Sequence, residues 1–158
     1  EFALRQIGPV AIRYPRATVP LSPDPLTPLE LGKAEILKEG KDFALVALGS
    51  MVEPSRGAIE LLREEGLLGT LINGRFIKPL DIDLFKRVLE KVKFVFSVEE
   101  GILEGGFGSA ISEATNSPVI KMGLPCAFIA HGARDPILDK YGLTAQGIAD
   151  KIKSSIHA

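Results

Sequence analysis

Uninterrupted runs of hydrophobic residues recur along the chain, and segments with the hydrophobic spacing of helices separate them. The clearest run is Phe43–Leu48, which contains no polar residue. A strand without polar alternation is covered on both faces, as in a mostly parallel sheet with helices on each side. Ile82, Phe85 and Leu89 instead repeat at helical spacing. The pattern therefore predicts an α/β fold.

The predicted strands and helices alternate from residue 33 onward. Two apolar segments, 34–37 and 43–48, flank a short connection that contains Gly40, and this arrangement predicts an antiparallel hairpin. Pro79 is predicted to lie in the first turn of a helix. The predicted strands are 34–37, 43–48, 67–72, 94–98 and 118–124, and the predicted helices are 53–64, 79–89, 106–114 and 144–156. Together they predict a three-layer α/β sandwich whose five-stranded, mostly parallel sheet carries one antiparallel strand.

The first 28 residues differ from the rest of the chain. Glu1–Gln6 is typical of a helix end, with Gly8 as its C-cap, and Val10–Tyr14 is a short apolar segment. Five prolines between residues 15 and 28 predict a semi-rigid linker, so we expect the compact domain to begin near Leu29. Because residue 1 is Glu rather than Met, we expect the chain to be a piece of a longer protein.

Composition narrows the classes of function. The chain has 158 residues, of which 46% are hydrophobic, and its net charge is -1. This balance predicts no broad basic surface for nucleic acid or anionic lipid, and the apolar runs are too short to cross a bilayer. A single cysteine, Cys126, and two histidines, His131 and His157, argue against a disulfide framework or a zinc site. We therefore expect a cytoplasmic protein that has no nucleic-acid or membrane partner and no metal site of its own.

The glycine-rich segment Gly105–Ser109 lies between a predicted strand and a predicted helix, where phosphate-binding loops occur. It completes neither a dinucleotide-binding motif nor a P-loop, because no Lys-Ser/Thr pair follows the glycines. Close packing of the helix start against the sheet explains the glycines equally well. We therefore favour a structural role for this segment.

Two adjacent carboxylates, Glu99 and Glu100, end a predicted strand. Paired carboxylates can serve as acid and base, but neighbours on a strand point to opposite faces and no nucleophile lies near them in sequence. A role at a helix terminus or an interface is favoured over catalysis. His131 and Cys126 are likewise expected to be structural or interfacial, with His131 holding its loop through a hydrogen bond.

Arg13 and Arg16 flank Pro15 in the short segment Arg13-Tyr14-Pro15-Arg16. A proline fixes the backbone between them, so two guanidinium groups are presented rigidly and suit phosphate or carboxylate. Two surface ion pairs would explain the same residues. Composition alone leaves both interpretations open.

Eight segments occur in the order known from one family. The chain resembles the C-terminal part of the 1-deoxy-D-xylulose-5-phosphate synthases, relatives of transketolase that depend on thiamine diphosphate. The resemblance covers nearly the whole chain, and the segment beginning at Tyr141 is the most specific to these synthases. The segments are 12–16, 47–51, 73–81, 98–100, 105–109, 123–125, 128–132 and 141–148.

The resemblance implies an enzyme that condenses pyruvate with glyceraldehyde 3-phosphate and releases CO2, in the isoprenoid pathway and in thiamine and pyridoxal synthesis. It implies thiamine diphosphate and Mg²⁺ in an intact homodimer, both held by upstream domains, because the Gly-Asp-Gly start of the cofactor motif does not occur here. It also divides the chain: 1–16 would be the end, with the last strand, of the middle domain, 17–28 a linker and 29–158 the third domain. This chain alone would bind no cofactor and supply no catalytic residue.

One functional residue of the family corresponds to a position here. The resemblance implies that Arg16 binds the phosphate of the sugar substrate in the intact enzyme, with Arg13 as a weaker candidate. The family usually has glycine at the position of Ala17 and aspartate at that of Cys126.

Three alternatives stay open. The chain could be the corresponding domain of a transketolase or a 2-oxo acid dehydrogenase β subunit. It could be a free-standing binding module with a ligand at the Gly105 loop, or an assembly subunit whose partner is encoded separately.

Overall fold

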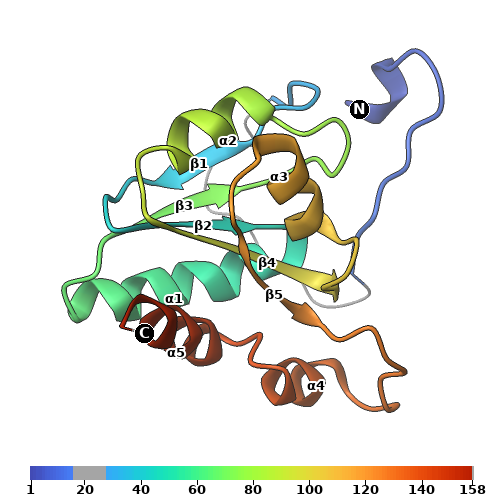
Figure 1. Cartoon of the computed structure of the whole chain (residues 1–158). Helices are drawn as coiled ribbons and strands as arrows, with labels where there is room; N and C mark the ends of the chain where they lie inside the picture. Colours follow the sequence, from blue (N-terminus) through green and yellow to red (C-terminus); the bar gives the residue numbers. More distant parts are fainter. Residues whose placement is uncertain (16–27, 158) are drawn as a thin grey trace.

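The computed structural model describes residues 1–15 and 28–157 of the chain. They form five strands, five α-helices and two short 3-10 helices (Figure 1). In chain order the elements are η1 (Ala3–Arg5), β1 (Glu35–Lys38), β2 (Phe43–Ala47), η2 (Gly49–Met51), α1 (Val52–Glu64), β3 (Gly69–Asn73), α2 (Ile82–Leu89), β4 (Phe94–Ile102), α3 (Phe107–Thr115), β5 (Ile120–Leu124), α4 (Arg134–Lys140) and α5 (Ala145–Ile156).

The five strands form one mixed sheet in the order β1-β3-β2-β4-β5. Strand β1 runs antiparallel to β3, and the other pairs are parallel, with Phe43 of β2 opposite Gly69 of β3 and Phe94 of β4. Helices α2 and α3 cover one face of the sheet, and α1 and α5 cover the other (Figure 1). The predicted three-layer sandwich with one antiparallel strand is confirmed.

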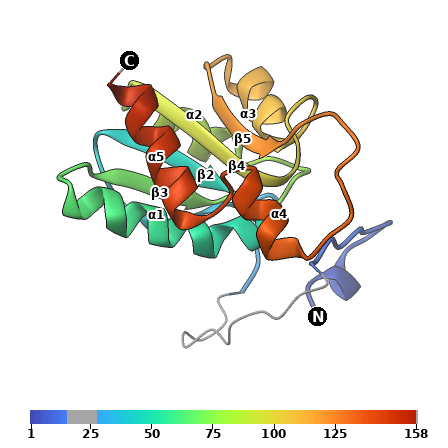
Figure 2. The same cartoon turned by 90° about the horizontal axis from the view of Figure 1, so that it is seen from below.

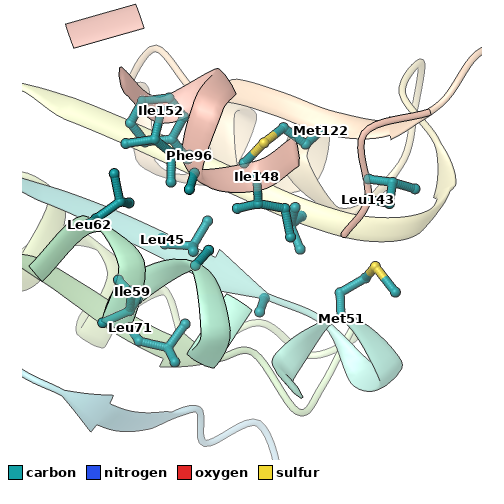
Figure 3. Close-up of a cluster of buried hydrophobic side chains, with 14 of the residues drawn as sticks. Leu45, Met51, Ile59, Leu62, Leu71, Phe96, Met122, Leu143, Ile148 and Ile152 are labelled. Carbon is teal, nitrogen blue, oxygen red and sulfur yellow. The ribbon is translucent and has the colours of Figure 1, made fainter. Parts of the chain in front are cut away.

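Strand β2 lies at the centre of the sheet, and all five of its residues are buried. Its successive side chains enter two separate hydrophobic clusters, because neighbours on a strand point to opposite faces. Leu45 packs with Phe96 and with α1 and α5, as Figure 3 shows, whereas Ala44 packs with α2 and α3. The unbroken apolar pattern of this strand follows directly from its two covered faces.

The predicted hairpin is wrong. Strand β1 pairs with β3 and not with β2, so β3 lies between the two strands that the hairpin would have joined. The connection around Gly40 bonds to β3 as well, because Gly40 and Thr70 exchange hydrogen bonds of 3.0 and 2.8 Å. A short glycine-containing connection is typical of a tight hairpin turn, but here it joins two strands that do not pair with each other.

The predicted helix start at Pro79 is also wrong. Asp81 is the N-cap of α2, and its carboxylate accepts hydrogen bonds from the N–H groups of Leu84 and Ala34. Because aspartate is a preferred capping residue, the helix begins after Asp81 and Pro79 lies outside it. Helix α4 was not predicted, and β4 extends to Ile102, beyond the predicted end at Val98.

Residues 1–15, called the N-terminal segment below, lie outside the sandwich formed by residues 28–157, called the body. The segment contains η1, which ends near the predicted helix end, and Gly8 has a φ of +105°. Residues 10–14 form no strand, because no other described strand pairs with their backbone. Both views place the segment at the end of the molecule where α4 lies and the C-terminus at the other end (Figures 1 and 2).

The predicted linker, 17–28, lies outside the described residues except for Pro28, and Arg16 lies outside them as well. Within the described parts of the chain, no helix combines the length and apolar character needed to span a membrane.

Candidate functional site at the carboxyl edge of the sheet

The carboxyl ends of β2 and β4 lie side by side, because the two strands are parallel and Ala47 is opposite Val98. Strand β4 continues past this point and carries Glu99 and Glu100 to the edge of the sheet. Their side chains leave the strand on opposite faces. The two carboxylates that stood together in sequence therefore enter different surroundings.

Glu99 is 5% exposed and caps helix α3. Its carboxylate accepts hydrogen bonds from the backbone N–H groups of Phe107, at 2.9 Å, and Gly108, at 3.0 Å. A carboxylate stabilises a helix N-terminus both through these bonds and through the helix dipole. The predicted role at a helix terminus is confirmed for Glu99.

The glycines of the Gly105–Ser109 segment permit this contact. A Cβ added at Gly106 would lie 2.6 Å from a Glu99 carboxylate oxygen, and one added at Gly108 would lie 2.1 Å from Ser97 Oγ. The start of α3 is thus packed directly against β4, and the predicted structural role of the glycines is confirmed. The N–H groups that could have received a phosphate are already used by Glu99.

Glu100 faces outward and joins three other parts of the chain. Arg134, the first residue of α4, donates two hydrogen bonds to the Glu100 carboxylate, from Nε to Oε1 at 3.0 Å and from Nη2 to Oε2 at 2.6 Å. Ser50 Oγ of η2 donates to Oε2 at 2.7 Å. From the N-terminal segment, Arg13 Nη2 donates to the backbone carbonyl of Glu100 at 2.8 Å. We call Arg13, Ser50, Glu100 and Arg134 the Glu100 cluster.

These contacts keep Glu100 ionised. Partial burial raises the pKa of Glu100, but the hydrogen bonds from Arg134 and Ser50 lower it more, so the pKa lies below its ordinary value of 4.5. The hydrogen bond to Glu100 in turn raises the pKa of Arg134 above its ordinary value. A carboxylate held by a two-pronged guanidinium suits a structural connection and not proton transfer.

Sequence reasoning identified Glu100 and Arg13, but not the contact between them and not Ser50 or Arg134. Ser50 follows β2, so its position at the same edge could have been inferred from the parallel pairing of β2 with β4. Arg134 gave no such signal, because it is brought to the edge by α4, a helix that the hydrophobic pattern did not predict.

The remaining candidates lie near this edge but outside the cluster. Cys126 and His131 are exposed, and the predicted hydrogen bond of the His131 side chain is not found within the described residues. A hollow of about 490 Å³ lies between Pro15, the end of β5 and α4, with Glu100 and Arg134 in its wall.

At this edge of the sheet, the described residues offer a diphosphate neither a cluster of metal ligands nor a free helix N-terminus. They contain no group of three or more His, Cys, Asp or Glu side chains that could hold a metal. The helix N-terminus of α3, which could have bound phosphate, carries the buried negative charge of Glu99. A phosphate at this position would meet a carboxylate at contact distance, and like charges repel.

Comparison with known proteins identifies the fold. The family described as "Transketolase, C-terminal domain" matches residues 32–148. The chain belongs to the transketolase C-terminal domain family. A transketolase C-terminal domain also explains the order of the mixed sheet, since a solved structure, "Split gene transketolase, inactive beta4 tetramer", superposes with a TM-score of 0.81 and 32% identity over 90% of this chain and 48% of that one.

Curated relatives of this transketolase C-terminal domain carry the name 1-deoxy-D-xylulose-5-phosphate synthase. It is 42% identical to the synthase of Synechococcus sp. (strain JA-2-3B'a(2-13)) over 96% of this chain, and 42% identical to that of Gloeobacter violaceus over 94%. The chain spans about a quarter of the length of these relatives, 24% and 25%. A 2-oxoglutarate:ferredoxin oxidoreductase from Magnetococcus marinus, at 18% identity and a TM-score of 0.59, shares the fold alone.

Proposed function

We propose that this chain is the C-terminal domain of a 1-deoxy-D-xylulose-5-phosphate synthase and serves assembly and active-site architecture. The intact enzyme would condense pyruvate with glyceraldehyde 3-phosphate, release CO2 and supply isoprenoid, thiamine and pyridoxal synthesis. It would act as a cytoplasmic homodimer without nucleic-acid or membrane partners.

One observation carries the proposal. The relatives match 96% of this chain, whereas the family model begins at residue 32. Such coverage leaves too few unmatched residues to omit the first 31, so the similarity to the synthases includes much of the N-terminal segment. The split-gene transketolase also covers 90% of this chain, but it is only 32% identical to it, whereas the Synechococcus synthase is 42% identical. The higher identity over nearly the whole chain supports a synthase over the other members of the family.

We further propose the division of the chain that the resemblance implies. Residues 1–16 would end the middle domain, 17–28 would link the domains, and 29–158 would form the third domain. The upstream domains would hold thiamine diphosphate and Mg²⁺, and the cofactor would supply the carbanion chemistry. The capped N-terminus of α3 is consistent with this division, because Glu99 already occupies the N–H groups of Phe107 and Gly108 that a diphosphate could use there.

Within the intact enzyme, Arg16 is the proposed ligand of the sugar phosphate, with Arg13 as the second candidate. Arg16→Ala should lower kcat/KM for glyceraldehyde 3-phosphate by roughly ten- to a hundredfold, the loss of a charge-assisted hydrogen bond of about 1.5–3 kcal/mol. Use of unphosphorylated glyceraldehyde should change little. Equal losses with both substrates would make Arg16 structural.

A hybrid enzyme tests the proposal as a whole. The C-terminal quarter of the Synechococcus synthase would be replaced by this chain, and formation of 1-deoxy-D-xylulose 5-phosphate would be measured with pyruvate and glyceraldehyde 3-phosphate. We expect an active hybrid, and a matched hybrid carrying a transketolase C-terminal domain should be far less active. A folded but inactive hybrid with this chain, beside an active transketolase hybrid, would contradict the assignment.

The chain by itself tests the division of labour. Calorimetric titration with thiamine diphosphate and Mg²⁺ should detect no binding, and sedimentation should find weak association or none. Micromolar binding of the cofactor would contradict the first expectation. A dimer that persists at nanomolar concentration would show that this domain dominates assembly.

A separately encoded subunit is the second candidate. The similar solved structure is that of a split-gene transketolase in the form of an inactive β4 tetramer, and this chain covers 48% of it. By analogy, this chain would associate with copies of itself and need a second polypeptide for activity. A stable tetramer of the 158-residue chain in sedimentation would favour this candidate over the synthase domain.

A further inference from the structure

Of the two arginines that flank Pro15, only Arg13 lies within the described residues. Arg13 has a protein partner, the backbone carbonyl of Glu100, 2.8 Å from Nη2. The two residues are 87 positions apart in sequence, so this contact ties the N-terminal segment to the body. Apart from this bond, an edge-to-face contact of Phe2 with Phe76, at 5.7 Å between ring centroids, joins the two parts.

The side-chain contacts of Glu100 hold its backbone carbonyl in place. Its carboxylate accepts hydrogen bonds from Arg134 of α4 and from Ser50 of η2. Together with Arg13 of the N-terminal segment, three separate parts of the chain therefore bind this one residue. The carbonyl lies on β4 beyond the last pairing with β2 at Val98, in the stretch between Val98 and Ile102 where the register with β5 is irregular, so the sheet alone would fix it less well. The side-chain bonds therefore orient the backbone acceptor that Arg13 uses.

The charges around Arg13 do not favour a phosphate. Among the described residues, the two positive groups of the cluster, Arg13 and Arg134, are balanced by two negative ones, Glu100 and Asp135, whose carboxylate lies 3.5 Å from Arg134 Nη1. A balanced cluster has no excess positive charge to attract a dianion. Phosphate sites are instead built from donors whose charge is not already compensated.

We propose that Arg13 anchors the N-terminal segment to the body, and that Glu100, oriented by Arg134 and Ser50, is the positioning residue for this anchor. The inference rests on the proposed function in one respect only: in the intact synthase, the anchored segment would be the end of the middle domain. Arg13 then aligns two domains, and substrate phosphate is left to Arg16.

The first experiment uses the 158-residue chain and needs no activity. Backbone ¹⁵N relaxation would give order parameters for residues 10–14 in the wild type, Arg13→Gln and Arg134→Gln. We expect values near 0.8 in the wild type, and below about 0.6 in both variants, the range of flexible backbone. Arg63→Gln, which removes a guanidinium from an exposed pair with Glu60 on α1, is the matched control and should leave these values unchanged.

Two results would overturn the anchor. Order parameters below about 0.6 in the wild type would mean that the bond does not hold the segment. Order parameters that stay near 0.8 for residues 10–14 in Arg134→Gln would mean that the carboxylate contacts of Glu100 do not position its carbonyl. The double variant Arg13→Gln/Arg134→Gln should be no more flexible than Arg13→Gln, because both changes remove the same contact.

The second experiment uses the full-length synthase that carries this sequence. Arg13→Gln should lower kcat/KM by about three- to tenfold for glyceraldehyde 3-phosphate and unphosphorylated glyceraldehyde alike, because domain alignment affects both substrates. A loss confined to the phosphorylated substrate would make Arg13 a phosphate ligand and overturn the inference. A wild-type enzyme that makes no deoxyxylulose phosphate would refute the proposed function instead, while the relaxation experiment would still decide the anchor.

Discussion

The body and the N-terminal segment are held in place by different means. The body buries its large side chains in two clusters, one on each face of the sheet, and Phe96 at its centre is fully buried. In the segment no residue is buried, and Leu4 and Ile7 are almost wholly exposed. Apolar burial is the main driving force of folding, so the body has what it needs to fold and the segment does not. Similarity to relatives across both parts does not imply that both are independently stable.

The largest contrast is expected from removing an apolar side chain in each part. Phe96→Ala should lower the free energy of unfolding by about 3–5 kcal/mol, since it leaves a cavity beneath α1 and α5. Ile7→Ala should change it by less than about 0.5 kcal/mol. Urea unfolding followed by circular dichroism measures both. Comparable losses would show that the segment packs on the body in solution more closely than the structure has it.

The buried cap on α3 should give the next largest effect. Glu99→Gln replaces an acceptor-only carboxylate with an amide whose NH2 group faces backbone N–H groups, and should cost about 1–3 kcal/mol in the free energy of unfolding. Glu104→Gln, at an exposed position three residues before α3, is the control and should cost almost nothing. An unchanged free energy of unfolding in Glu99→Gln would mean that the close packing at the glycines, and not the carboxylate, holds the start of α3.

Lowering the pH below about 4.5 should reduce the contribution of the Glu100 contacts to the free energy of unfolding. Because the pKa of Glu100 is lowered in the folded chain, its ionised form stabilises the fold fully above its ordinary value of 4.5. This contribution is lost as the pH falls through the lower folded value, where protonation favours the unfolded state. Unfolding free energies measured from pH 6 to 3 should therefore fall more steeply for the wild type than for Glu100→Gln. Identical slopes would contradict the ionised assignment.

The smallest effect is expected where the segment touches the body. Phe2→Ala removes the edge-to-face contact with Phe76, yet it should alter the free energy of unfolding of the body by less than about 0.5 kcal/mol, because the segment can open locally without global unfolding. Leu4→Ala is the matched control, since this side chain is 91% exposed. A loss above about 1 kcal/mol for Phe2→Ala alone would show that segment and body unfold as one unit.

The sequence predicted those features that depend on local pattern. Covered strands such as β2 have no polar alternation, so the class and the three layers could be read directly, and Glu99 could be placed at a helix terminus. Pairing could not be read in the same way: β1 pairs with β3, a strand that comes after β2 in the chain, and the short connection around Gly40 carries no signal of that pairing. The Glu100 cluster was missed in part because Arg134 reaches it from α4, whose seven residues are too few to show a clear hydrophobic period.

The neighbouring positions of Glu99 and Glu100 have a consequence for how this chain can change over evolutionary time. The two residues are chemically identical, and only the alternation of β4 sends one to cap α3 and the other to meet Arg134. Deleting one residue between Phe94 and Val98 would send each side chain to the opposite face. It would aim the outward carboxylate at the buried helix start and leave Arg134 without its partner. Insertions and deletions within this stretch should therefore be eliminated even where a conservative single substitution is accepted.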